Sequence, residues 1–322
     1  MSGPGAGSVV ALSGGVGGAK LAFGLDRILP AGRLTVIANT GDDFEHLGLS
    51  ISPDIDTLVY TLGGLANPET GWGRAGETWT FMRALAALGG ERWFNLGDGD
   101  LAMHLERTRR LAAGERLGAV TAAIAARLGV RSRIVPMSDD PVRTHIHTPA
   151  GVLMLQHWFV RERCEPEVLA VEIRGAGDAR PHPDALAALA AADLRAVVIC
   201  PSNPFISIEP ILALPGLRAA LVACDAPVVA VSPIVGGEAV KGPTAKMLRD
   251  TVGASSAAAV AARYGSLLTG YVLDRRDAGD AAAIDVAVKM TDTLMTTPAA
   301  RERLAAEVLG FADGLRAGGR RA

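Results

Sequence analysis

Short, continuous apolar runs alternate along the chain with longer stretches in which apolar residues recur at helical spacing. The apolar runs are four or five residues long and are bounded by turn-forming residues, which is typical of buried strands. They cover 9–12, 34–38, 133–137, 196–200 and 227–231, and Ala- and Leu-rich helical stretches such as 183–192 and 210–222 lie between them. Continuous apolar strands alternating with helices predict an α/β fold in which a mainly parallel sheet has helices on both faces.

The same pattern indicates how the chain is divided. Its 322 residues fit one large α/β domain over 1–322, without an internal repeat or a linker. The segment 65–132 is mostly helical in pattern, so we expect a helical cap inserted into the α/β core. Residues 315–322 are basic and Gly-rich, and we expect them to form a flexible tail.

Composition narrows the class of protein. Hydrophobic residues make up 49% of the chain, enough apolar material to exclude global disorder. With 32 basic and 34 acidic residues the net charge is −2, which argues against binding to nucleic acid or to an anionic membrane. A ligand-binding protein or an enzyme is the remaining expectation.

Three further features predict a cytoplasmic protein. Cys164, Cys200 and Cys224 are far apart and form no CxxC pair, so reduced thiols are expected rather than disulfides or a zinc site. The N-terminal residues carry no basic region ahead of the first apolar run, unlike a secretory signal. No run of about 20 apolar residues is present, so no membrane span is expected.

Polar and Gly-rich loops follow the predicted strands. In parallel sheets, ligands bind beyond the carboxyl ends of the strands, so these loops are expected to meet at one site. The loops are SGGVGGAK (13–20), NTGDD (39–43), PMSDDP (136–141), CPSNPF (200–205) and SPIVGGEAVKGP (232–243).

The first loop places Gly14, Gly15, Gly17 and Gly18 between a strand and a helix, which is typical of a Rossmann-like phosphate cradle. It is not a Walker A motif, because Lys20 is followed by Leu rather than by Ser or Thr. It is not a GxGxxG fingerprint either, because Lys20 occupies the third glycine position. A tight turn that packs the helix on the strand is the alternative interpretation.

The next segment carries four carboxylates, Asp42, Asp43, Asp54 and Asp56. A site with only one or two carboxylate ligands suits Mg²⁺, which keeps several waters and bridges substrate phosphates. The alternative is structural, because Gly-Asp-Asp forms turns and Asp or Ser before a helix caps it.

Aromatic residues are scarce but concentrated. Phe, Trp and Tyr number 7, 4 and 3, and five of them fall in 72–94: Trp72, Trp79, Phe81, Trp93 and Phe94. Such a cluster suits a planar heterocycle, with the polar Asn95 beside it to orient the ring. The other possibility is that these residues form the core of the cap.

Taken together, the loops resemble those of the 2-phospho-L-lactate transferase (CofD/FbiA) family. The resemblance runs from about residue 8 to 297 with the motifs in the same order. It is carried by LSGGVGGAKLAFGL (12–25), NTGDDFEHLGLSISPDIDTLVYTLGG (39–64), WFNLGDGDLAMHL (93–105), VPMSDDPVRT (135–144), CPSNPFISIEPIL (200–212), VSPIVGGEAVKGP (231–243) and DTLMTT (292–297).

The resemblance implies a Mg²⁺-dependent transferase of coenzyme F-420 biosynthesis. The donor is a three-carbon acid activated by guanosine diphosphate (GDP), so the transferred group is 2-phospholactate, phosphoenolpyruvate or phosphoglycerate. The acceptor is the terminal ribityl hydroxyl of the deazaflavin FO, and GMP is released. A homodimer is also implied.

Residue roles follow from the same resemblance. Asp42 and Asp43 match acids near the metal and the reacting hydroxyl, where one acts as general base or holds Mg²⁺. Gly-Asp-Asp stands where some relatives have Ala-Glu-Asp, which favours Asp43. Asp56 and Asn95 match contacts to FO, and Asp43 and Asp56 are the expected Mg²⁺ ligands. The motifs that surround the nucleotide contribute Gly14, Gly15, Gly17, Gly18, Ser202, Asn203, Ser232 and Gly236.

Two other functions compete. A nucleotide-sugar-binding regulator of the gluconeogenesis-factor-like type has a similar glycine loop but an Asp-Asp-Gly-Gly-Ser-type segment, whereas here Asp43 is followed by Phe-Glu-His. A Rossmann oxidoreductase is disfavoured by the broken glycine fingerprint and by the missing acidic residue after the second strand.

Overall fold

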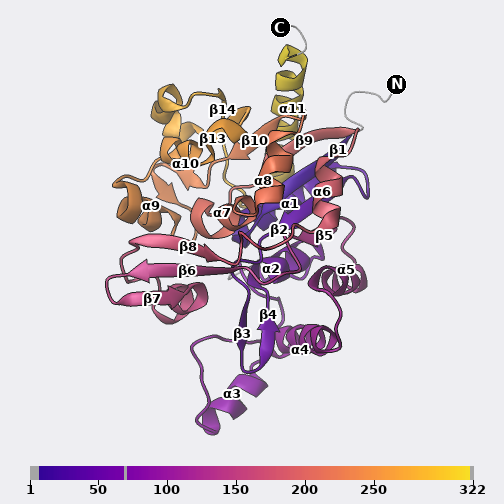
Figure 1. Ribbon diagram of the computed structural model, residues 1–322, viewed down its shortest axis with the longest axis vertical. Coiled ribbons are helices and arrows are strands. Elements are labelled where there is room, and N and C mark those ends of the chain that lie inside the picture. Colours follow the sequence, from indigo (N-terminus) through magenta and orange to yellow (C-terminus); the bar gives the residue numbers. More distant parts are fainter. Residues whose placement is uncertain (1–6, 69–70, 320–322) are drawn as a thin grey trace.

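A seven-stranded sheet lies at the centre of the molecule, in a computed structural model that describes residues 7–68 and 71–319. The strand order is β14-β13-β10-β9-β1-β2-β5, and every neighbouring pair is parallel (Figure 1). The strands are β1 (Ser8–Ser13), β2 (Leu34–Ala38), β5 (Arg133–Pro136), β9 (Leu194–Ile199), β10 (Val228–Val231), β13 (Gly270–Asp274) and β14 (Ala287–Thr291).

Helices cover both faces of this sheet, as the sequence predicts. Val9 and Ala11 of β1 belong to one apolar layer, and Val10 and Leu12 belong to the other. The first layer is completed by α1 (Gly15–Ile28), α2 (Pro53–Leu62), α5 (Leu117–Arg127) and α11 (Pro298–Gly319). The second is completed by α6 (Pro183–Leu189), α7 (Glu209–Leu212), α8 (Pro215–Val222), α9 (Thr244–Val252) and α10 (Ala257–Tyr264).

Two helices differ from the sequence pattern. The first one begins at Gly15 rather than near Ala19, so most of the predicted glycine loop is the first turn of α1. The helix predicted over 210–222 is two helices, α7 and α8, preceded by a π-helical turn at Pro204–Ile208. Pro215 has no N–H to donate to the preceding turn, which ends α7 and starts α8.

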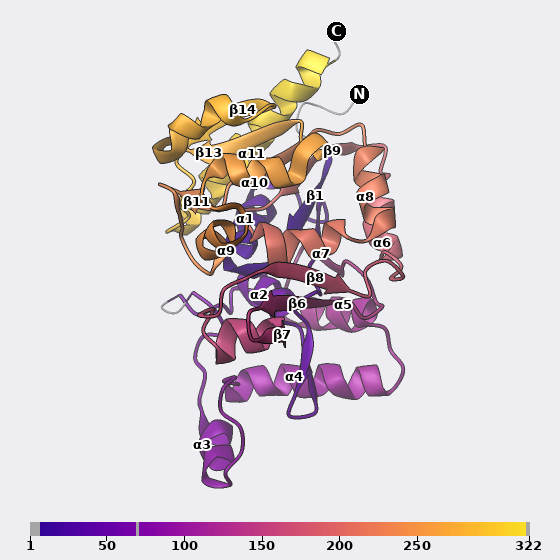
Figure 2. The ribbon, with the colours of Figure 1, turned by 60° about the vertical axis from the view of Figure 1, so that its left-hand side comes forward.

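The segment 65–132, where the sequence predicts a helical cap, is divided between two regions of the structure. Figures 1 and 2 show α3 (Thr80–Ala87) and α4 (Asp98–Ala112) at the end of the molecule opposite α11, next to the hairpin of β3 (Phe44–His46) and β4 (Leu49–Ile51). These elements surround a small apolar cluster of their own. In contrast α5 packs its apolar side under the sheet, so it belongs to the α/β layer.

The expectation of a flexible tail over 315–322 needs correction where the chain is described. Helix α11 continues to Gly319, because its apolar positions at spacings of three and four reach Leu315, which packs against the core. The Arg316 Nη1 donates to the carbonyl oxygen of Leu194 at 3.0 Å. Residues 320–322 lie outside the described residues.

Smaller elements complete the fold. A three-stranded antiparallel sheet consists of β6 (Arg143–Thr148), β7 (Gly151–Met154) and β8 (Ala170–Arg174), and β11 (Ile234–Val235) pairs with β12 (Glu238–Ala239). Within 7–68 and 71–319 no single helix is long and apolar enough to cross a membrane. One pair of helices, Pro204–Leu212 and Pro215–Val222, is long and apolar enough only when the two are taken together, and the pair is bent by 84°.

Candidate active site

The order of the strands fixes where a ligand binds. From β1 the chain first extends the sheet on one side through β2 and β5, and later on the other side through β9 and β10. The boundary between β1 and β9 is therefore the topological switch point, where doubly wound sheets bind their ligands. The Gly14 amide, which follows β1, donates to the Ser202 hydroxyl, which follows β9, at 3.1 Å.

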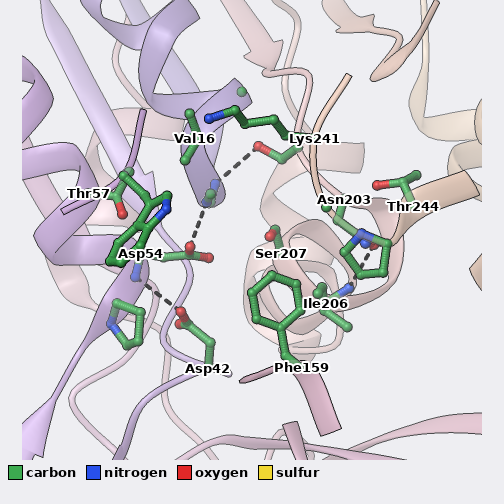
Figure 3. Close-up of a pocket in the computed structure, with 18 of the residues that line it drawn as sticks. Val16, Asp42, Asp54, Thr57, Phe159, Asn203, Ile206, Ser207, Lys241 and Thr244 are labelled. Atoms are coloured by element: carbon green, nitrogen blue, oxygen red, sulfur yellow. Dashed lines mark hydrogen bonds between the residues drawn. The ribbon is translucent and has the colours of Figure 1, made fainter. Parts of the chain in front are cut away.

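A cavity of about 630 Å³ opens at this switch point. Figure 3 shows Asp42, Asp54 and Thr57 on one side of it and Asn203 and Thr244 on the other. Predicted site residues that line the cavity are Gly14, Gly15, Gly17, Asp42, Asp56, Asn95, Ser202, Asn203 and Ser232. The size is in the range of pockets that enclose a small-molecule ligand.

The glycines at the start of α1 serve close packing. A Cβ on Gly17 would lie 2.3 Å from the Pro201 carbonyl oxygen, and a Cβ on Gly18 would lie 2.4 Å from the Ser202 hydroxyl. Gly15 differs, because it has a φ of +65° and a Cβ there would meet only the Ser207 hydroxyl, at an ordinary contact distance of 3.9 Å. Its N–H points to the Asp54 carboxylate, with 2.6 Å between Gly15 N and Asp54 Oδ1.

Two buried carboxylates face the cavity together. Asn39 Nδ2 donates to Asp42 Oδ1 at 3.2 Å and to Asp54 Oδ2 at 2.9 Å. The Asp54 amide donates to Asp42 Oδ2 at 3.1 Å (Figure 3). Burial, with the neighbouring Asp54 charge, raises the pKa of Asp42 well above its usual range. Burial also raises the pKa of Asp54, to about 6. Neither buried carboxylate therefore has a positively charged partner that would stabilise its ionised form.

Asp43, the acid that the sequence favours, does not line this cavity. Its Oδ2 accepts from the Ser52 hydroxyl at 3.0 Å, and its Oδ1 is buried without a hydrogen-bond partner. It lines a second, small space together with Arg143 and with Asp42, which borders both spaces. Burial outweighs the attraction of Arg143 and Arg107 and raises the pKa of Asp43 to about 7.

Asp56 lines the cavity, but its charge is already compensated. The guanidinium of Arg107 on α4 donates to both oxygens of Asp56, and Arg107 is 2% exposed. His104 is next to them, with 3.6 Å between its Nδ1 and Asp56 Oδ2. On the other edge of His104, Nε2 lies 3.2 Å from Asp100 Oδ2, and Asp100 Oδ1 accepts from the Tyr60 hydroxyl at 2.5 Å.

Aromatic rings close the cap end of the cavity. Trp72, Trp93, Phe94 and Phe159 line it, and the rings of Trp93 and Phe94 meet edge to face at 5.7 Å. Asn95 is exposed at the rim of this part. Trp93 and Phe94 therefore line the cavity and also pack against the cap core.

The part of the cavity beside the start of α1 is positively charged. Lys20 on α1 and Lys241 after β12 both line it, and in Figure 3 the Lys241 side chain extends toward Val16 at the start of α1. Burial, with the nearby charges of Arg301 and Lys241, lowers the pKa of Lys20. This part can therefore receive an anionic group.

Sequence reasoning placed some residues at the site that lie elsewhere and missed others. Gly18 does not line the cavity, and the Gly236 amide donates to Asp277 Oδ2 at 2.9 Å in a turn away from it. The cavity is also lined by residues to which the sequence assigned no role, namely Lys20, Tyr60, Asp100, His104 and Ser207, and by Asp54, which was one of the four candidate carboxylates. Helical spacing offered a signal, because Asp56 and Tyr60, like Asp100 and His104, are four residues apart on one helix.

No group of three or more His, Cys, Asp and Glu side chains is arranged to hold a metal ion among the residues that the structure describes. The pair Asp42 and Asp54 supplies oxygen atoms only, and neither side chain is paired with a cation. That donor set fits a hard cation that keeps waters and shares substrate oxygens.

Fold and site define a class. A Rossmann-like sheet has at its switch point a cavity that lysines, carboxylates and aromatic rings line together. This is the arrangement of an enzyme that binds an anionic, nucleotide-like ligand together with a planar one.

Comparison with known proteins identifies the family. The family model described as 2-phospho-L-lactate transferase CofD matches residues 9–305. The chain is 43% identical over 318 residues to a phosphoenolpyruvate transferase of Streptomyces griseus, covering 96% of this chain and 99% of that protein. It is 38% identical over 308 residues to a 2-phospho-L-lactate transferase of Methanosarcina acetivorans, and the match covers 95% of this chain and 99% of that protein. The protein belongs to the CofD family.

This result confirms the predicted class of function. The protein is an enzyme that transfers a phospho-acid group in coenzyme F-420 biosynthesis. A regulator of the gluconeogenesis-factor-like type is not favoured. A crystal structure of a UPF0052-family protein from Bacillus halodurans has a TM-score of 0.60 over 94% of this chain and 98% of that one, at 14% identity, and so shares the fold.

Proposed function

We propose that the enzyme transfers phosphoenolpyruvate from enolpyruvyl-diphosphoguanosine to the terminal hydroxyl of FO. The hydroxyl oxygen forms a bond to the phosphorus that carries the acid, the bond from that phosphorus to the bridging oxygen breaks, and GMP leaves. The hydroxyl proton passes to a carboxylate or to solvent. Relatives at 43% and 44% identity that are named phosphoenolpyruvate transferase favour this acid over 2-phospholactate and phosphoglycerate.

The chemistry of the residues that line one cavity carries this proposal. A guanosine diphosphate ester needs cations and amides, which Lys20, Lys241 and the start of α1 offer. A deazaflavin needs flat apolar walls with a few polar groups, which Trp93 and Phe94 offer together with Asp56 and Asn95. We place the reacting phosphorus beside Asp42 and Asp54, which line the same cavity.

We propose that Mg²⁺ binds at Asp42 and Asp54. These side chains line the cavity without a cation beside them, whereas Asp43 does not line it and Asp56 is paired with Arg107. When bound, Mg²⁺ supplies positive charge that stabilises the charge on the transferring phosphoryl group. The protein supplies position: Asn39 and the backbone amides of Gly15 and Asp54 hold both carboxylates in place.

Mg²⁺ binding is expected to release protons and to tighten as pH rises from about 5.5 to 7.5. Burial raises the pKa of Asp42 well above its usual range and that of Asp54 to about 6, so at low pH the cation must displace protons from these carboxyls. Calorimetric titration in two buffers of different ionisation enthalpy measures the protons released. The Asp42→Asn variant is the control, and affinity that is independent of pH with no proton release contradicts the assignment.

Lys20→Met is expected to weaken GDP binding by about 10–100-fold, because a charged hydrogen bond to phosphate is worth about 1.5–3 kcal/mol. The affinity for GMP should fall less than the affinity for GDP, since GMP carries one phosphate fewer. The control is Lys246→Met, because Lys246 is paired with Asp250 on α9 and does not line the cavity. Equal GDP affinity in wild type and Lys20→Met, measured by calorimetry, contradicts the placement of the diphosphate beside Lys20.

Titration with FO, followed by its fluorescence, tests the function as a whole. We expect saturable binding that GDP and Mg²⁺ strengthen, and turnover of the three candidate donors then identifies the acid. A folded protein that binds no FO under any of these conditions overturns the proposal.

Two further properties remain proposals. We propose a cytoplasmic protein, supported by three cysteines that are all free. We also propose a homodimer, supported by apolar surface on the cap, where Leu88 and Leu105 are 86% and 59% exposed. Light scattering of the purified protein tests the second property.

A further inference from the structure

Arg107 is a buried cation that does not line the cavity yet determines the charge of a residue that does. It lies on cap helix α4 and is 2% exposed. Its Nη1 is 3.2 Å from Asp56 Oδ2, its Nη2 donates to Asp56 Oδ1, and Nη1 also donates to the Ser50 carbonyl oxygen at 3.3 Å. The guanidinium therefore holds the Asp56 carboxylate from behind, as a two-pronged fork.

The neighbouring carboxylates of the cavity are held differently. Asp42 and Asp54 accept hydrogen bonds from the Asn39 amide and from backbone N–H groups, and no cation pairs with either. All three acids lie close together on the chain and face the same cavity. What distinguishes Asp56 from the other two is Arg107.

We propose that Arg107 is a positioning residue that reserves Asp56 for the acceptor substrate and prevents it from binding the metal. The inference rests on the proposed function, because it assumes an acceptor at the cap end and a cation at Asp42 and Asp54. A fork that occupies one lone pair on each oxygen leaves the remaining ones to accept hydrogen bonds from substrate hydroxyl or N–H groups. A divalent cation on the same carboxylate is repelled by the guanidinium behind it.

The geometry also explains why this position needs an arginine. Lys has a single ammonium group and cannot bind both oxygens of a carboxylate with fixed geometry. His104 completes the arrangement, with its Nδ1 at 3.3 Å from Arg107 Nη1 and its Nε2 facing Asp100. One face of α4 thus orients Asp56, which α2 supplies.

Two variants separate positioning from a structural role. Arg107→Met frees Asp56, so Mn²⁺ binding measured by electron paramagnetic resonance should rise from about one to about two ions per chain. In the double variant Arg107→Met with Asp56→Asn, the number of bound Mn²⁺ ions should return to about one per chain. Arg107→Lys keeps the charge but loses the fork, so Mn²⁺ stays near one per chain while KM for FO rises about 10-fold with little change in kcat.

Arg109→Met is the matched control, because Arg109 is on the same helix, exposed and paired with Glu106. A merely structural role would lower the melting temperature of the Arg107 variants and leave Mn²⁺ stoichiometry and KM unchanged, which overturns the inference. If Arg107→Met does not fold, the KM for FO of Arg107→Lys decides whether Arg107 has a positioning role. Wild type that binds no FO, with the Mn²⁺ shift still present in Arg107→Met, contradicts the proposed function but not the role of Arg107 in excluding the metal.

Discussion

Asp42→Asn is expected to lower kcat by about 10³-fold, the loss typical of removing a group that stabilises transition-state charge. Asp42 faces the cavity with no cation beside it, and Asn cannot hold Mg²⁺ as a carboxylate does. The variant should fold, because a neutral amide is easier to bury than a carboxylate whose pKa burial already raises. Steady-state kinetics with saturating FO and donor measure the effect.

Asp43→Asn is the informative comparison, since the two acids are adjacent. Asp43 faces away from the cavity and binds the Ser52 hydroxyl, so its loss should lower kcat by about 10-fold or less. A loss as large as that of Asp42→Asn would mean that Asp43 reaches the metal or the hydroxyl in the working enzyme, as the sequence alone favours.

Gly17→Ala is expected to destabilise the fold by about 1–3 kcal/mol and to weaken nucleotide binding. The new Cβ would lie 2.3 Å from the Pro201 carbonyl oxygen, so α1 and the segment after β9 must separate at the switch point. Ser202 follows Pro201 directly, and its bond from Gly14 would be strained. Thermal unfolding and GDP titration of the same preparation measure both effects.

Gly310→Ala is the opposite case on α11. Nothing lies within 4 Å of a Cβ placed there and the residue is exposed, so better helix propensity should stabilise the protein by about 1 kcal/mol. A Gly17→Ala protein that melts at the wild-type temperature would show that the contact with Pro201 relaxes without cost.

The strands could be predicted because each is a continuous apolar run buried on both faces. Helix ends were harder, since they depend on local backbone. Gly15 starts α1 in a left-handed conformation that the letters GGVGG do not reveal. The assignment of α5 was out of reach because its Ala-rich pattern suits a cap or a sheet layer equally, and only packing under the sheet decides.

For the site, the loops could be predicted but not the direction of each side chain. Asp42 and Asp43 are equivalent in the sequence, and the turn after β2, with Asp43 N donating to the Thr40 oxygen at 3.2 Å, decides which one faces the cavity. Arg107 escaped notice because its partner Asp56 is 51 residues away on another helix. Gly236 belongs to a motif that also contributes to the site, yet its amide donates a hydrogen bond to Asp277.

The cap has a consequence for how such an enzyme diversifies. The proposed donor site consists of α1, the segments that follow β9 and β10 of the central sheet, and the segment that follows β12. The acceptor end is shared between α2 and the cap, where α4 supplies Asp100 and His104. Changes confined to the cap can therefore alter which alcohol is accepted while the chemistry at phosphorus is inherited intact, so the insertion is the replaceable part of the enzyme.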